Sequence, residues 1–145
     1  MKGERIAYYK GIKYWLATPY RTQTSIRPKF DITTEWIDLD CAGLLAIRAG
    51  YAWDGPTDPA PDLVCMMRPS LKHDAFGDLM RKGWLDFDSY YQAINQDLEK
   101  TCIEDGCPEW AASLVFHSVH DLSGGKWARY CSDGEGGSRP LCFAP

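Results

Sequence analysis

The sequence predicts an α+β fold in which N-terminal antiparallel β-strands pack against a C-terminal segment of three helices. Residues 4–53 are rich in β-branched and aromatic side chains that Gly, Pro and Asp interrupt. Residues 69–122 carry apolar side chains at helical spacing. From residue 123 onward Gly and Ser dominate without periodicity, which predicts an irregular Gly-rich tail. A chain of 145 residues has the size of one domain. We therefore expect a single domain with a β-rich part (4–53), a loop (54–68), a helical part (69–122) and a tail (123–145).

The β-rich part is expected to hold short strands at residues 6–9, 14–18, 30–38 and 44–48, the last running on to residue 53. The sequence Cys41-Ala42-Gly43 predicts the turn before the last of these strands. A meander of antiparallel strands is the simplest arrangement for such short, closely spaced segments.

Each expected helix has an apolar stripe and recognisable ends. Proline is accepted in a first turn, aspartate caps a helix start, and glycine follows a helix end. Such residues mark the expected ends: Pro69 and Gly83 for the first helix, Asp86 or Asp88 and Gly106 for the second, and Pro108 and Gly124 for the third.

Composition and charge exclude several classes of protein. The net charge is −4 and no basic run exceeds two residues, which argues against nucleic acid as the main partner. No apolar run approaches the roughly 18–20 residues that span a bilayer, so we expect a soluble protein without a membrane span. The first residues lack the apolar core of a secretory signal, which favours a cytoplasmic location.

The six cysteines form no C-x-x-C pair and have no zinc-site spacing. In a cytoplasm they are expected to remain thiols and to act as small apolar side chains. Cys131 and Cys142, which flank the Gly-rich tail, are the one pair to check for a bridge.

Two segments stand out as a candidate site. GYAWDGPTDPAPD, residues 50–62, is a strand end that runs into a proline-stiffened loop with three carboxylates, among them Asp54. LKHDAF, residues 71–76, opens the first helix and places His73 next to Asp74. Gly77, one turn after His73, allows close approach, so we expect the loop and the helix to face each other.

Asp54, His73 and Asp74 permit two interpretations. As a functional site, they could bind a divalent metal through imidazole and carboxylate ligands, or Asp54 could orient His73 as a general base. As a structural network, they would join loop and helix by hydrogen bonds, because buried polar groups need partners.

Two weaker hypotheses use other acidic and histidine residues. His117, His120 and Asp121 share a face of the third helix at a spacing that can hold a metal, or lie at its surface. The pairs Asp54/Asp58 and Asp74/Asp78 could serve glycosidase chemistry, although nothing fixes their separation. The sequence contains no G-x-S-x-G, P-loop, H-E-x-x-H or dinucleotide motif.

The ordered motifs G-Y-x-W-D-G-P-(S/T) and L-x-H-D-A-(L/F), about fifteen residues apart, resemble the DUF1353 family of phage and prophage proteins. The similarity spans residues 14–125 and includes NQDLEKTCIEDG in the second helix. It maps the family's acidic turn residue to Asp54 and its His-Asp pair to His73 and Asp74. The acidic residue usual in the second helix falls on Asn95, and Thr57 stands where Ser is usual.

The resemblance implies a phage origin, without an assigned activity. Our first hypothesis is a small phage structural or accessory protein of the tail or virion. Its partners would be other phage proteins, and it would reside in the host cytoplasm or be incorporated into the virion. The alternative is a metal-dependent, hydrolase-like enzyme that uses Asp54, His73 and Asp74, with a divalent metal as cofactor. Asn95 in place of an acid, and the lack of an obvious nucleophile, favour the first.

Overall fold

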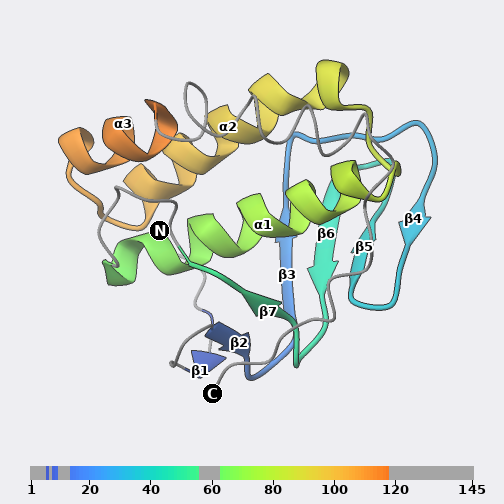
Figure 1. Ribbon diagram of the computed structural model, residues 1–145, viewed down its shortest axis with the longest axis horizontal. Coiled ribbons are helices and arrows are strands. Elements are labelled where there is room, and N and C mark those ends of the chain that lie inside the picture. The colour runs from blue at the N-terminus through green and yellow to red at the C-terminus, as the bar shows by residue number, and fades with distance from the viewer. Residues whose placement is uncertain (1–5, 7, 10–13, 56–62, 118–145) are drawn as a thin grey trace. The chain divides into compact units, whose positions relative to one another are not determined.

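The computed structural model describes residues 6, 8–9, 14–55 and 63–117 (Figure 1). The predicted α+β class is confirmed, since antiparallel strands occupy the N-terminal half and three helices follow. The chain divides into two compact units, one up to Asp54 and one from Gly55, which are described separately below. The single-domain organisation stays a prediction. Within the described residues, no helix has the length and apolar character needed to cross a membrane.

The first unit contains two antiparallel sheets. A three-stranded sheet has the order β1-β2-β7 and a four-stranded sheet has the order β3-β6-β5-β4 (Figure 1). The strands are β1 (Tyr8–Tyr9), β2 (Tyr14–Leu16), β3 (Tyr20–Gln23), β4 (Ile32–Thr33), β5 (Ile37–Leu39), β6 (Leu44–Ile47) and β7 (Ala52–Trp53). Alternation along β3, β5 and β6 buries one face of the four-stranded sheet, including Tyr20, Ile37, Leu39, Leu45 and Ile47.

The single strand predicted over residues 30–38 is wrong, because the chain turns back at Thr34. The Thr34 N–H donates to the Ile37 carbonyl at 2.9 Å, and the Thr34 hydroxyl oxygen accepts from the Ile37 N–H at 3.0 Å. These bonds close a hairpin between β4 and β5. The segment 44–53 is also broken, at Gly50, whose φ of +93° is a conformation that favours glycine.

The strand β3 was missed, and it changes the topology. Its residues alternate between buried and exposed, but only Tyr20 is strongly apolar, so the β pattern is weak. It pairs with β6, and the predicted meander therefore holds only for β4, β5 and β6. The predicted turn at Cys41-Ala42-Gly43 is confirmed, with a φ of +89° at Gly43.

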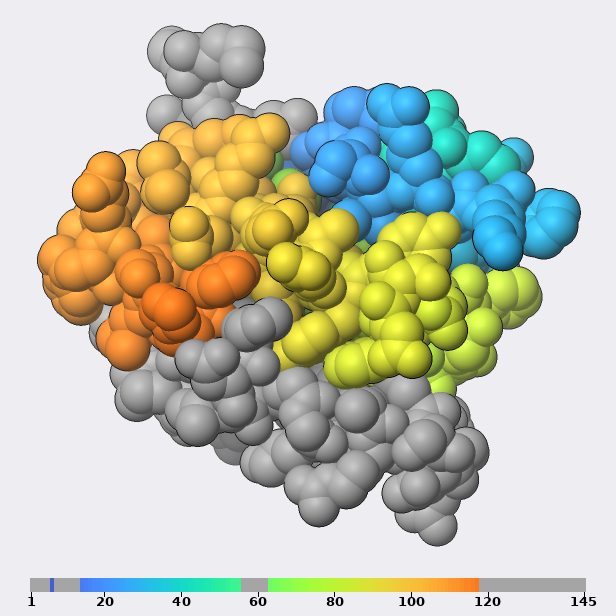
Figure 2. All heavy atoms as spheres, turned by 90° about the horizontal axis from the view of Figure 1, so that it is seen from above, coloured from blue at the N-terminus to red at the C-terminus, as the bar shows by residue number. Residues whose placement is uncertain are grey.

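The second unit is helical. A short 3-10 turn, η1 (Val64–Met66), leads into α1 (Met67–Arg81), which is followed by α2 (Phe87–Glu104) and α3 (Glu109–His117). The Asp86 carboxylate caps α2 by accepting from the Ser89 N–H at 2.8 Å. Glycines with positive φ end α1 and α2, as predicted. Figure 2 shows α2 and α3 side by side on one face of this unit.

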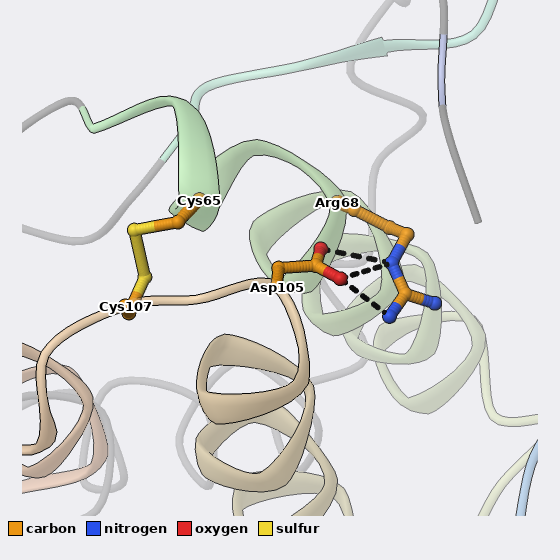
Figure 3. The surroundings of a disulfide bond; sticks show 4 residues. All are labelled: Cys65, Arg68, Asp105 and Cys107. Carbon is orange, nitrogen blue, oxygen red and sulfur yellow. Dashed lines mark hydrogen bonds and ion pairs between the residues drawn. A yellow bond between two sulfur atoms is a disulfide. The ribbon is translucent and has the colours of Figure 1, made fainter. Parts of the chain in front are cut away.

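A disulfide joins the start of the helical unit to the turn between α2 and α3. Cys65 in η1 bonds to Cys107 (Figure 3). The bond lies beside an apolar cluster that includes Met66, Leu98 and Val115. The expectation that all six cysteines remain thiols is therefore wrong for this pair. The sequence could not reveal it because the partners lie 42 residues apart. Cys131 and Cys142 lie outside the described residues.

Breaking this disulfide should weaken the helical unit. A cross-link that closes a loop of 42 residues restricts the unfolded chain and adds about 4 kcal/mol of stability in the loop-entropy model. We expect the double variant Cys65→Ser/Cys107→Ser to have a lower midpoint of urea unfolding than wild type. Reductant should lower the midpoint of wild type and leave that of the double variant unchanged. Equal midpoints for oxidised wild type and the double variant would contradict this expectation.

Candidate functional site

The polar residues of the candidate site lie where α1 and α2 run antiparallel. Arg68, Lys72 and His73 of α1 are all buried, each less than a tenth exposed. Their partners lie in α2 or at its C-terminal cap, and their residue numbers fall as those of the α1 residues rise, from Asp105 for Arg68 to Asn95 for His73. This order defines the antiparallel pairing, and we call these contacts the α1–α2 polar row.

Arg68 forms the first contact of the row. Its Nε lies 2.9 Å from Asp105 Oδ2, and its Nη2 lies 2.8 Å from Asp105 Oδ1 (Figure 3). Two parallel N–H···O bonds of this kind fix the orientation of both side chains. The more exposed Glu104 adds a contact at 3.5 Å. The row therefore begins one turn after the disulfide and holds the same end of α2.

Lys72, one turn further along α1, forms the second contact. Its ammonium nitrogen lies 3.0 Å from Asp97 Oδ2 and donates to Thr101 Oγ1 at 3.0 Å. The lysine side chain is 4% exposed and that of Asp97 is 10% exposed. A charge buried this deeply needs its partner, because an unpaired ion in a protein interior is costly.

We expect Lys72→Met to destabilise the protein by roughly 3–5 kcal/mol, because Asp97 is left as an uncompensated buried charge. The exposed pair of Lys100 and Glu104, 3.6 Å apart on the same helix, supplies the control. Lys100→Met should change stability by less than about 1 kcal/mol. Urea unfolding of both variants checks the contrast, which equal losses would contradict.

His73 and Asn95 form the third contact. His73 Nε2 and Asn95 Oδ1 are 2.9 Å apart, and the two residues are 3% and 0% exposed. Burial lowers the pKa of His73 to about 4, the bond to Asn95 opposes the shift, and Arg81 adds to it. The imidazole is therefore neutral at neutral pH. Asn95 Nδ2 is buried and makes no hydrogen bond within the described part of the chain.

The lowered pKa of His73 predicts loss of stability in mild acid. Unfolding restores a pKa near 6.5, so the unfolded chain binds a proton between about pH 6.5 and 4 while the folded chain does not. Stability should fall across this window by about 3 kcal/mol and level off below it. His73→Gln should abolish this part of the pH dependence. Parallel unfolding curves for both proteins across the window would contradict the assignment.

A small cavity adjoins the polar row within the second unit. Ser70, His73 and Asp74 contribute the polar part of its lining, and Leu98, Cys102 and Val115 contribute apolar groups. Its volume of about 10 Å³ corresponds to a single water-sized space. The Ser70 hydroxyl donates to the Met67 carbonyl at 3.0 Å within the same helix.

The predicted site residues fall in both units. Asp54 is exposed and ends the first unit, whereas His73 and Asp74 belong to the second. A contact of Asp54 with the His-Asp pair therefore stays a prediction, as does the metal site on these three residues. Among residues 14–55 and 63–117, no three His, Cys, Asp or Glu side chains are grouped to hold a metal.

The remaining candidates have different surroundings. Asp78 forms an ion pair with Arg81, three residues further along α1. His117 is exposed and packs edge-on against Phe116, with ring centres 5.5 Å apart. His120, Asp121 and Asp58 lie outside the described residues, so the hypotheses that use them stay untested.

The two free cysteines described are poor nucleophiles. Burial raises the pKa of Cys102 to about 12, with a smaller effect of Asp105. A hydrogen bond to Asp31 raises the pKa of the exposed Cys41. Both side chains are therefore thiols at neutral pH, and thiolate chemistry has no support at either position.

Sequence reasoning did not identify the polar row. Asn95 enters only through the family resemblance, Arg68 falls in the predicted loop (54–68), and Lys72 is assigned no role. A periodic pattern was present, since Arg68 and Lys72 are four residues apart and Asp97, Thr101 and Asp105 recur at the same interval. Such matched stripes on consecutive helices indicate a polar contact when the connecting loop is short.

Comparison with family models, curated proteins and solved structures gives no match to this chain.

Proposed function

We propose that this protein is a small structural or accessory protein, and that the contact between His73 and Asn95 holds α1 against α2. The observation that carries this proposal is the buried bond between His73 Nε2 and Asn95 Oδ1. A general base works best when its pKa lies near the operating pH, and a pKa of about 4 makes His73 a weak base. Its position third in a row of helix-joining contacts supports a structural role.

The biological setting we propose is a tailed phage, with other tail or virion proteins as partners. This part rests on the resemblance of the motifs around Asp54 and His73 to DUF1353 proteins. The Cys65–Cys107 disulfide supports residence in the virion, because disulfides persist in oxidising surroundings and are rare in a reducing cytoplasm. The protein would be made in the host cytoplasm and form its disulfide after release.

A metal-dependent hydrolase using Asp54, His73 and Asp74 is the second candidate. One observation favours it, namely that Ser70, His73 and Asp74 line the same small cavity. A metal there would take its ligands from the imidazole and the carboxylates. Such a site predicts that metal stabilises the wild-type protein and that removal of its ligands abolishes the effect.

A double-mutant cycle separates the two candidates. If this contact joins the helices, His73→Ala and Asn95→Ala should each cost about 1–3 kcal/mol, because each leaves a buried polar partner unpaired. The double variant should cost less than the sum, since both changes remove one contact. Ser113→Ala, an exposed change on α3, serves as the control.

Thermal melts of wild type, the two single variants, the double variant and Ser113→Ala, with Zn²⁺, with Mn²⁺ and with chelator, provide the measurement. We expect each single variant to be destabilised, the double variant to lose less than the sum, and metal to leave the melting temperature unchanged. Stabilisation of wild type by metal, lost in His73→Ala, would overturn the structural role in favour of the hydrolase. Detection of the protein in purified virions by mass spectrometry tests the phage setting, and its absence there would contradict a virion component.

A further inference from the structure

The partly exposed face of the four-stranded sheet carries a hollow that the proposed function does not use. The hollow measures about 370 Å³ and lies entirely within the first unit. Residues from all four strands line it, among them Arg21 of β3, Thr33 of β4, Asp38 of β5 and Ala46 of β6. This volume is in the range of small-molecule binding sites.

The hollow arises from one small side chain at the centre of the sheet. In the strand register, Ala46 stands opposite Arg21 on one side and opposite Asp38 on the other. Leu44 and Arg48 lie two residues away along the chain, and a period of two places them on the same face of the strand. A single methyl group surrounded by four larger side chains leaves the space that forms the hollow.

The charges around this space are arranged asymmetrically. Arg21 is exposed on the β3 side, and its guanidinium has no hydrogen-bonding or ionic partner within the described residues. Across Ala46, Asp38 and Asp40 supply two carboxylates. Arg48 lies 2.9 Å from Asp38 Oδ2 and compensates one of them. The hollow is therefore positive toward β3 and negative toward β5.

We propose that this hollow binds a short zwitterionic peptide, with its carboxylate on Arg21 and its ammonium group toward Asp38 and Asp40. Neighbouring strands are about 4.8 Å apart, so β3 and β5, separated by β6, are about 10 Å apart. An extended tripeptide spans a similar length of about 10 Å. A simple anion would meet repulsion from the carboxylates, and a simple amine would meet repulsion from Arg21.

The test is an NMR titration of the full-length, ¹⁵N-labelled protein with trialanine. Contacts between exposed charges are weak, so we expect a dissociation constant of about 1 mM, rising with salt. Amide shifts should concentrate at Arg21, Asp38 and Ala46. Peptides acetylated at the N-terminus or amidated at the C-terminus should each bind several-fold more weakly. No shifts up to about 10 mM, or equal binding of the blocked peptides, would overturn the proposal.

Variants locate the site without relying on its charges alone. Ala46→Leu should fill the hollow and abolish binding, whereas Ala42→Leu at the exposed turn should not. Arg21→Gln should weaken binding of trialanine but leave the amidated peptide unaffected, and Lys29→Gln controls for the loss of one positive charge. Thermal melts confirm that each variant is folded. If folded Ala46→Leu binds trialanine as tightly as wild type, the peptide binds elsewhere and the proposal is wrong.

Discussion

The paired charge of Lys72 with Asp97 is the constraint on which the helical unit depends. A buried ammonium group must remain with its carboxylate, and Thr101 accepts from the same nitrogen. Sliding α2 by a single turn would separate Lys72 from Asp97. Apolar contacts alone tolerate such shifts better, because one aliphatic side chain can replace another at little cost. The ion pair thus fixes the register between α1 and α2.

The register set by Lys72 determines the chemistry of its neighbour. His73, the next residue, meets Asn95 because the pairing of the helices is already fixed. The amide offers a hydrogen bond without a negative charge, and this bond opposes only part of the lowering of the His73 pKa by burial. A carboxylate at position 95 would instead favour the imidazolium ion. The identity of this one residue therefore decides whether the pair is neutral or charged.

The two units use small and polar residues in opposite ways. In the helical unit, polar side chains are buried and paired, and they specify how α1 and α2 align. In the four-stranded sheet, the charged residues stay at the partly exposed face around Ala46, where Arg48 pairs with Asp38. The buried polar pairs therefore fix the register of the helices, whereas the charges on the sheet form an accessible dipolar surface.

Local sequence determined the fold class, the three helices and several of their ends. Capping by Asp86 and glycine after α1 and α2 depend on backbone conformations of a few adjacent residues, so the sequence alone predicts them. The hairpin at Thr34, the pairing of β3 with β6, the bond of Cys65 to Cys107 and the contact of His73 with Asn95 emerged only from the tertiary structure. Three of these features join segments that are far apart in the sequence and approach each other only in the complete fold. The hairpin at Thr34 is local, but it depends on which strands pair in the sheet. Local preference cannot set these pairings, because their free energy comes from non-local burial and from partners that local sequence does not specify.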